Sequence, residues 1–440
     1  MKRLTFTGGV HPYEGKELSK DKPITEVRPG KELVFLLSQH IGAPAKPCVA
    51  VGDRVLAGQK IAEAGSFVSA PVHSSVSGTV KAFEKRKNAV GEMAEAVIIE
   101  NDGQYEKVRY NPAESLESLS KEEIINRIKE AGVVGMGGAG FPTHVKLSPK
   151  EPDKLDYVLV NGSECEPYLT SDYRRMIENP EWIIAGLKCI LRLFDNAKGY
   201  ICIEDNKPDA ISRMQSLTAN EKRIEVKTVM TKYPEGAERC LINAVTGRKV
   251  NSSMLPADAG CVVDNIDTVV AVYKAVMLGQ PLTERIFTVS GDAVKDPRNL
   301  SVKVGTSYNE LIEPAGGFIG KPEKMISGGP MMGFALYGLD VPVTKTSGAL
   351  TCFLHDDVSK EKETACISCA RCVNGCPARL MPCKLATFAE HHDTEKFLEY
   401  YGMECVECGS CSFQCPAKRP LAADIKSMRR TILANRKKKR

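Results

Sequence analysis

The sequence lacks any apolar segment long enough to cross a membrane. A spanning helix needs roughly 18 or more apolar residues in a row, and Lys188 and Arg192 interrupt the best candidate, 182–194. The amino terminus, with Gly8-Gly9 and His11-Pro12, also lacks the apolar stretch of a secretory signal. We therefore expect the chain itself to stay in the cytosol, where clustered cysteines more often bind metal than form disulfides.

The body of the chain also lacks an excess of positive charge. The 440 residues have a formal net charge of +5, but residues 429–440 hold seven basic side chains and no acidic one, which leaves residues 1–428 at −2. Nucleic-acid-binding domains carry a basic surface, so nucleic acid is not an expected partner. The basic tail has two interpretations: it binds an anionic membrane surface or another protein of a complex, or it is a solvated end.

Cysteine, in contrast, is abundant, and half of the sixteen cysteines lie in two identical runs. Residues 366–377 and 405–416 both read C-x2-C-x2-C-x3-C-P. This spacing is typical of bacterial ferredoxins, in which the fourth cysteine of each run binds the other cluster. We therefore predict two [4Fe–4S] clusters with crossed ligands. The first would be held by Cys366, Cys369, Cys372 and Cys415, and the second by Cys405, Cys408, Cys411 and Cys376.

Zinc is the alternative metal for these thiols. Zinc sites usually pair two separate C-x2-C knuckles, which disfavours zinc here. Residues 385–400, between the runs, are predicted to form one helix. Cys383 follows the first run by seven residues and is interpreted as a core thiol, with a ligand role as the alternative.

A glycine-rich segment, 135–141, matches G-x-G-x-x-G, but its context differs from that of a Rossmann fingerprint. A strand should precede that motif, whereas Ser120 and Glu123 form a capping box for a helix that leads into the segment. Glycines still let the backbone come close to a ligand. The segment is therefore a candidate binding loop of another kind.

Short apolar segments alternate with helical ones between residues 157 and 278, which predicts a largely parallel sheet covered by helices. We expect strands at 157–160, 200–203 and 224–230, and helices at 179–194, from 208, from 236 and at 267–278. Ligands of such sheets bind beyond the carboxyl ends of the strands. The polar segment 161–167 lies at such an end, so we interpret it as a binding loop, with a plain turn as the alternative.

Four ordered segments, 135–146, 161–167, 233–238 and 263–268, resemble the flavin and NADH segments of the flavoprotein subunit of respiratory complex I. Together with the cysteine runs and FTGGVHP (6–12), they make the whole chain resemble the RnfC/RsxC family, the C subunits of the Rnf complex, a membrane-bound ferredoxin:NAD oxidoreductase. The resemblance implies an ion-translocating oxidoreductase with non-covalent FMN and with NAD(H) as substrate. It also implies other membrane and iron–sulfur subunits as partners, ferredoxin indirectly, and a peripheral position on the cytoplasmic face of the bacterial membrane.

By position, the resemblance assigns ten residues to FMN: Gly135, Gly137, Lys146, Asn161, Ser163, Glu164, Gly236, Asp264, Asn265 and Thr268. It assigns six to NADH: Gly138, Ala139, Phe141, Glu166, Tyr233 and Glu238. Three positions depart from the complex I pattern, because Met136 replaces an arginine, Ser163 an aspartate and Asp264 an asparagine. Hydride transfer requires no general base, so no acid or base catalyst is assigned.

The predicted fold is multidomain, α/β plus β. Its parts are an amino-terminal arm (1–27), a barrel-sandwich hybrid (28–110), a Rossmann-like α/β FMN/NADH domain (111–284), a β-grasp domain of the SLBB type (285–350), an α-helical dicluster ferredoxin domain (351–428) and a basic tail (429–440). The barrel sandwich resembles lipoyl carriers, but no lysine lies between Lys60 and Lys81, so we do not expect a swinging arm. The β-grasp domain is interpreted as a spacer. The alternative functions are a cobalamin reductase with the same domains and a non-catalytic iron–sulfur wire or scaffold.

Overall fold

The computed structural model describes residues 4–138 and 140–438, and a four-stranded parallel sheet forms its central unit. In spatial order the strands are β11 (Ile224–Val229), β10 (Lys198–Glu204), β9 (Tyr157–Gly162) and β12 (Cys261–Asn265). All three pairings are parallel, which confirms the predicted sheet. Strand β12 was not predicted, because its five residues lead directly into a helix.

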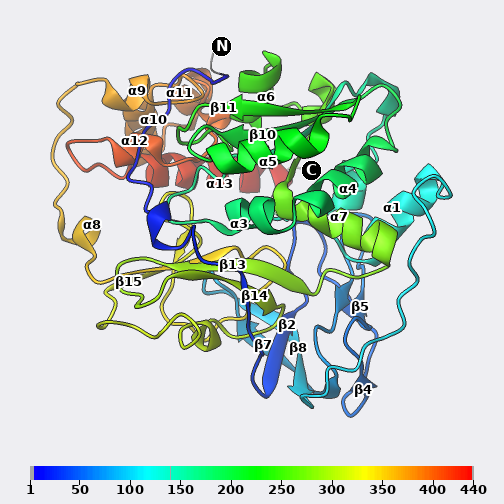
Figure 1. Cartoon of the computed structure of the whole chain (residues 1–440). Helices are drawn as coiled ribbons and strands as arrows, with labels where there is room; N and C mark the ends of the chain where they lie inside the picture. The colour runs from blue at the N-terminus through cyan, green and yellow to red at the C-terminus, as the bar shows by residue number, and fades with distance from the viewer. Residues whose placement is uncertain (1–3, 139, 439–440) are drawn as a thin grey trace.

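Helices cover both faces of this sheet (Figure 1). Val158 and Ile201 face α4 (Pro180–Leu191), α5 (Pro208–Thr218) and α7 (Ile266–Leu278). Leu159 and Cys202 point the other way, toward α6 (Glu238–Thr246), because successive side chains of a strand alternate between faces. The other helices of this unit are α1 (Lys121–Glu130), α2 (Thr143–Lys146) and α3 (Ser171–Glu178).

The glycine-rich segment follows a helix, as predicted. The Glu123 N–H donates to the Ser120 hydroxyl at 3.2 Å, and the Ser120 N–H donates to the Glu123 carboxylate at 2.7 Å, so the capping box at the start of α1 is formed. Beyond α1, the Gly135 N–H donates to the Phe141 carbonyl at 2.9 Å. The segment is therefore a closed loop between α1 and α2.

Two β-rich units lie below the α/β unit in Figure 1. The amino-terminal one has two antiparallel sheets, β2-β8-β7-β4 and β3-β5-β6. Its strands are β2 (Glu32–Leu36), β3 (Lys46–Pro47), β4 (Arg54–Val55), β5 (Lys60–Glu63), β6 (Val72–His73), β7 (Gly78–Lys87) and β8 (Met93–Asn101).

The second β-rich unit is a mixed six-stranded sheet in the order β1-β14-β13-β17-β15-β16. The strands are β1 (Thr25–Glu26), β13 (Glu284–Ser290), β14 (Arg298–Lys303), β15 (Lys324–Ser327), β16 (Phe334–Ala335) and β17 (Ala349–Phe353). The amino-terminal arm thus adds a strand to this sheet, and β17 continues past the boundary expected at residue 350.

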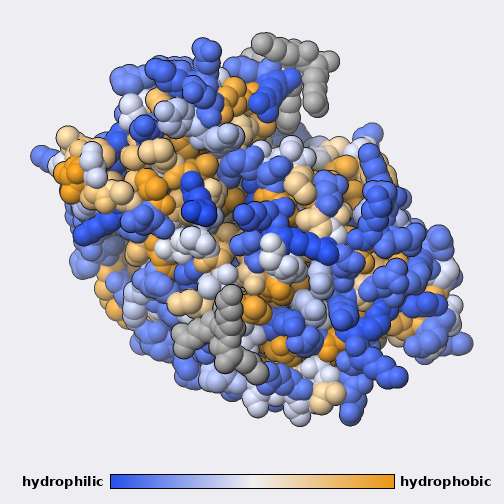
Figure 2. All heavy atoms as spheres, turned by 90° about the horizontal axis from the view of Figure 1, so that it is seen from above, coloured by the Kyte–Doolittle hydropathy of each residue, from blue (hydrophilic) through white to orange (hydrophobic). Residues whose placement is uncertain are grey.

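The cysteine-bearing region is helical and lies beside the α/β unit (Figure 1). Its helices are α8 (Asp357–Lys360), α9 (Arg371–Asn374), α10 (Pro382–Glu390), α11 (Thr394–Glu399), α12 (Ser410–Phe413) and α13 (Leu421–Lys438). Seen from above, apolar residues gather on the left of the molecule (Figure 2), the side on which Figure 1 places α9 and α12. Among the residues described, none of the helices is both long and apolar enough to cross a membrane.

The single helix predicted over 385–400 is wrong. Helix α10 ends at Glu390, and α11 begins only at Thr394. His392 between them has a φ of 54°, which interrupts right-handed helix. Asp393 then caps α11 by accepting the Lys396 N–H at 3.0 Å.

Candidate flavin and iron–sulfur sites

The four segments that resemble flavin-binding segments meet at the carboxyl ends of β9 and β12. Asn161 of β9 and Asn265 of β12 are register partners. The Asn161 amide donates to the Gly236 carbonyl at 2.8 Å, which brings the third segment to this edge. The Met136 N–H donates to the Thr268 hydroxyl of α7 at 2.9 Å, which brings the glycine loop there. Tertiary structure therefore gathers residues that are up to 132 positions apart.

Lys146, at the end of α2, reaches the same edge. Its Nζ donates to the Val263 carbonyl at 2.8 Å and to Asp264 Oδ1 at 3.1 Å. Burial acts to lower the pKa of Lys146, but the negative charges of Asp264 and Glu238 outweigh it, and the pKa is raised. A side chain that keeps its positive charge is therefore held where FMN was predicted.

Two buried oxygens at this edge have no hydrogen-bond partner within the described ranges. They are Ser163 Oγ and Asp264 Oδ2. An unpaired buried polar atom costs roughly 1–3 kcal/mol, so such atoms indicate a site that a ligand completes. The ribityl hydroxyls and ring N–H of FMN are donors of the kind that a carboxylate and a hydroxyl accept. The residues present therefore fit FMN.

The glycine loop leaves its backbone open on this side. Gly137 and Gly138 are both exposed. Gly137 has a φ of 98°, and a Cβ there would lie 3.2 Å from the Asn265 amide nitrogen, so glycine is favoured. A Cβ on Gly138 would meet no described atom within 4 Å. Ala139, predicted to contact NADH, lies outside the described residues, and Phe141 is half-buried at the end of the loop.

Glu164 and Glu166 bind backbone N–H groups. Glu164 accepts the Asp172 N–H at 2.7 Å at the start of α3, where a carboxylate is favourable. Glu166 accepts the N–H groups of Met331 and Met332 at 2.7 and 3.1 Å. Those two methionines lie between β15 and β16 of the second β-rich unit, the β-grasp unit, so this unit contacts the predicted binding loop.

Tyr233, which is predicted to contact NADH, is buried. Its side chain is 2% exposed, and its hydroxyl donates to the Cys408 carbonyl at 2.7 Å. Tyr233 packs with Val10 and Cys408, with Cys165 against the same cluster. Its side chain is therefore not accessible to a dinucleotide in this structure, and it connects the α/β unit to the second cysteine run instead.

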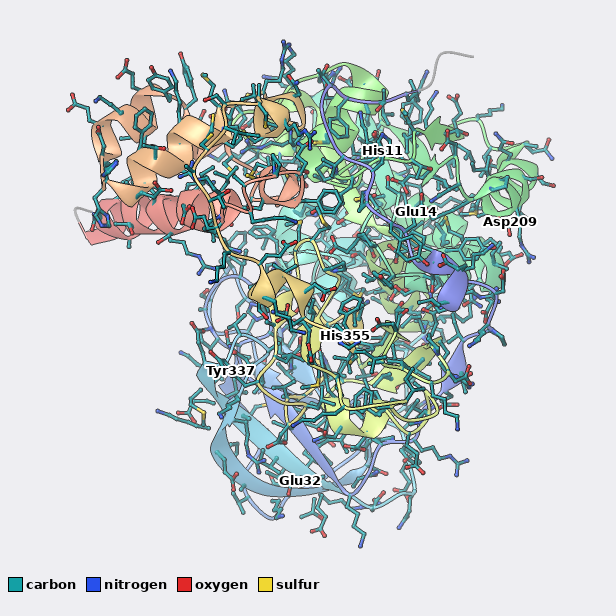
Figure 3. The ribbon with its side chains drawn as sticks, turned by 90° about the vertical axis from the view of Figure 1, so that its left-hand side faces the viewer. His11, Glu14, Glu32, Asp209, Tyr337 and His355 are labelled. Atoms are coloured by element: carbon teal, nitrogen blue, oxygen red, sulfur yellow. The ribbon has the colours of Figure 1, made fainter. Side chains whose placement is uncertain are left out.

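The amino-terminal arm, to which the sequence assigned no role, connects the same parts. The buried Lys16 donates to the carbonyls of Glu164, Glu166 and Leu169 at 2.7, 3.2 and 2.7 Å, and so holds the binding loop. Figure 3 shows this arm, marked by His11 and Glu14, running between the cysteine-bearing helices and the α/β unit. The arm therefore contributes to both candidate sites.

Farther toward the amino terminus, the arm contacts the first cysteine run. The Gly9 N–H donates to the Gly375 carbonyl at 3.0 Å. Val10 and Tyr233 exchange two backbone hydrogen bonds of 2.8 and 2.9 Å. The paired glycines of the FTGGVHP segment thus lie where a side chain would separate these parts.

The four cysteines predicted for the second cluster line one cavity. They are Cys376, Cys405, Cys408 and Cys411. The Leu380 N–H donates to the Cys376 sulfur at 3.4 Å, and the Glu407 N–H donates to the Cys405 sulfur at 3.3 Å. Burial, followed by the charges of neighbouring thiols, raises the pKa of Cys405 to about 11 despite the N–H of Glu407, and also raises that of Cys411. A bound metal centre reverses this effect, because coordination deprotonates a thiol. Four thiols that line one cavity are the donor set of a [4Fe–4S] cluster, so the residues present fit such a cluster.

The cysteines predicted for the first cluster are less enclosed. Cys366 and Cys369 are exposed, whereas Cys372 and Cys415 pack together with Cys383. Burial first, and Cys383 and Cys415 next, raise the pKa of Cys372 to about 11. Within residues 4–138 and 140–438, no three His, Cys, Asp or Glu side chains converge as ligands of one metal ion.

A buried charge network under the glycine loop was not predicted. Asp267 of α7 accepts hydrogen bonds from Arg175 at 2.9 Å and from Arg285 at 2.8 Å. The Arg285 guanidinium also touches the Met136 sulfur. Met136 replaces an arginine of the complex I pattern, and here an arginine from β13 lies against it. Only the tertiary structure could reveal this, because no spacing relates residues 136, 175, 267 and 285.

Comparison with known proteins relates these sites to characterised complexes. The chain matches the RnfC barrel sandwich hybrid domain over residues 4–104, the Nuo51 FMN-binding domain over 128–274 and the SLBB domain over 286–335. It is 44% identical over 401 residues to the C subunit of the proton-translocating ferredoxin:NAD(+) oxidoreductase complex of Clostridium ljungdahlii, covering 91% of this chain and 87% of that protein.

A second relative covers the full length. The C subunit of the Na(+)-translocating ferredoxin:NAD(+) oxidoreductase complex of Acetobacterium woodii is 41% identical over 439 residues, which is 100% of this chain and 99% of that protein. Among solved structures, an air-oxidised NAD+-reducing [NiFe]-hydrogenase has a TM-score of 0.50 at 18% identity. The match covers 76% of this chain and 67% of the hydrogenase chain. That likeness concerns the fold alone.

Proposed function

The chain belongs to the RnfC family, the C subunits of ion-translocating ferredoxin:NAD(+) oxidoreductase complexes, and from this premise we propose that it is the component that reacts with NAD(H). In this proposal electrons pass between two [4Fe–4S] clusters, FMN and NAD. The other subunits of the complex are its partners, and it is bound peripherally at the cytoplasmic face of the membrane.

The α/β unit would bind FMN at the carboxyl ends of β9 and β12. FMN, when bound, supplies the conversion between a hydride and single electrons that iron–sulfur clusters require. Lys146 would place its positive charge at the flavin, and Asp264 and Ser163 would accept hydrogen bonds with the oxygens that are unpaired now. The open backbone at Gly137 and Gly138 would leave room for the dinucleotide.

The cysteine-bearing helices would hold the two clusters with crossed ligands. The cavity that joins Cys376 to Cys405, Cys408 and Cys411 supports this grouping for the second cluster. The matching set, Cys366, Cys369, Cys372 and Cys415, would hold the first. Four cysteines around a space suit a cubane better than a single zinc ion, which draws its ligands to one point.

One observation carries the proposal: the α/β unit touches the second cysteine run directly. Tyr233 lies three residues before Gly236, which Asn161 binds at the flavin edge, and its hydroxyl donates to the Cys408 carbonyl at 2.7 Å. The second cluster would therefore exchange electrons with FMN. The first, with Cys366 and Cys369 exposed, would exchange them with another protein of the complex.

Cofactor analysis of the anaerobically purified chain tests this function. We expect about eight irons and eight sulfides per chain, one FMN released by acid precipitation, and reduction of flavin and clusters by NADH. A folded chain without flavin, or one whose flavin NADH cannot reduce, would contradict the proposal. Lys146→Ala is the informative variant, since FMN content should fall while iron content stays unchanged.

A further inference from the structure

The two cysteine runs are copies of one structural repeat of 39 residues, and the copies differ at one informative position. Helices α9 and α12 begin 39 residues apart, as do α10 and α13. Three pairs of residues with the same separation share a positive φ: Ser368 and Glu407, Ala370 and Gly409, Arg379 and Lys418. The sequence spacing therefore reflects a common backbone path around each set of cysteines.

The informative position is the second residue of the long helix in each copy. In the second copy it is Ala422, which lines the cavity with Cys405, Cys408 and Cys411. In the first copy it is Cys383. The repeat thus places a fifth thiol at the wall of the first site, where the second site has only a methyl group.

The contacts of Cys383 agree with this placement. It packs in one apolar cluster with Cys372 and Cys415, two predicted ligands of the first cluster, and this apolar cluster also includes Cys411 and Ala422 of the second copy. Ala422 donates its N–H to the Ser412 hydroxyl at 2.9 Å, and its methyl side chain offers no ligand. Cys383 therefore lies in the same small core as Cys372 and Cys415, and the repeat assigns it to the wall of the first site.

We propose that Cys383 is a reserve ligand of the first iron–sulfur cluster, able to take the place of Cys372. This inference rests on the proposed function, since it requires the cluster. When Cys372 is lost, the Cys383 thiol releases its proton to water and its sulfur forms the iron–sulfur bond that Cys372 made. Thiolate is the ligand that such clusters select, and the alanine at the equivalent position of the second site offers none.

The iron content of matched variants tests the proposal. The second site serves as the internal control, because it has alanine at the position equivalent to Cys383. Cys372→Ala should keep about eight irons per chain, whereas Cys411→Ala, its counterpart 39 residues on, should keep about four. The double variant Cys372→Ala/Cys383→Ala should also keep about four. Paramagnetic resonance of the reduced proteins identifies which cluster remains.

The outcomes separate this inference from the function beneath it. A wild-type chain without iron would overturn the proposed function. A wild-type chain with about eight irons and a Cys372→Ala chain with about four would overturn only the reserve ligand. Ala422→Cys in the Cys411→Ala background should restore the second cluster, and it decides the matter if Cys372→Ala does not fold. Equal iron with and without Ala422→Cys would then overturn the inference.

Discussion

The two cysteine runs have the same spacing and the same backbone, yet their surroundings differ. Cys408 and Cys411 of the second run are buried, and Tyr233 of the α/β unit binds the carbonyl of Cys408. Cys366 and Cys369 of the first run are exposed, and Ile367 between them is 67% exposed. Local sequence therefore determines the backbone path of each run, and the neighbouring parts of the chain determine how far its cysteines are exposed.

The largest effect should come from breaking the crossed ligation. Cys376 belongs to the first run by sequence. Nevertheless, Cys376→Ser should abolish or shift the paramagnetic resonance signal of the same cluster as Cys405→Ser. Serine is a harder and poorer ligand for iron, so about four irons should be lost. If the signal lost in Cys376→Ser instead coincides with that lost in Cys369→Ser, each run supplies all four ligands of its own cluster, and the crossed ligation is wrong.

Disrupting the contact between the amino-terminal arm and the first cysteine run should have the next largest effect. Gly8 has a φ of 88°, and a Cβ there would lie 2.7 Å from the Cys376 carbonyl oxygen. Gly8→Ala should lower the free energy of unfolding by roughly 1–3 kcal/mol beyond the backbone strain and should speed the loss of the second cluster to a chelator. Gly52→Ala is the control, since φ is 93° and a Cβ would meet no described atom within 4 Å. Equal effects in both variants would refute the role of the arm.

A smaller effect should follow removal of the Tyr233 hydroxyl. Tyr233→Phe keeps the packing and loses one hydrogen bond, worth roughly 0.5–1.5 kcal/mol. Stopped-flow spectroscopy should show flavin reduction by NADH unchanged and the following reduction of the second cluster slowed. Tyr308→Phe, which loses a hydrogen bond of 3.0 Å to Ser327 inside the β-grasp unit, should leave both steps unchanged. Slower flavin reduction in Tyr233→Phe would return this residue to the NADH site.

The last effect concerns the flavin side and the dependence of stability on pH. Burial first, and the charges of Glu164 and Asp267 next, raise the pKa of Asp172 to about 8, and the Asn265 amide donates to it at 2.6 Å. The folded chain holds this proton between about pH 4 and 8 while the unfolded chain releases it, so stability falls as pH rises through that window. Asp172→Asn should flatten the fall in urea titrations. Asp195→Asn, at an exposed carboxyl, should not, and an unchanged slope in Asp172→Asn would show that Asp172 is ionised.

Prediction from sequence succeeded where the signal is local. The capping box of α1 was predicted from residues three positions apart, and it forms because it needs only one turn of helix. Three of the four strands of the parallel sheet, all but β12, were found from short apolar runs, because both faces of such a sheet are buried. The break between α10 and α11 was missed, because the positive φ of His392 cannot be inferred from the spacing of apolar residues.

The candidate sites show the same difference between features that local sequence predicts and features that depend on tertiary packing. Resemblance placed Lys146, Asn161 and Asp264 at a flavin site, and the fold brings them to one edge. It did not anticipate that Glu166 binds the β-grasp unit or that Lys16 holds the loop. These contacts span about 150 to 165 positions in the chain and depend on domain packing, which no motif encodes.

The sequence by itself determined the cysteine spacing, the repeat of 39 residues and the order of the flavin segments, because each depends on neighbours along the chain. Only the tertiary structure decided which run lies against the α/β unit, what Tyr233 binds and where Cys383 lies relative to Cys372. The physical reason is that burial and distance are properties of packing. Two runs with the same chemistry acquire different environments once one of them is covered by another domain.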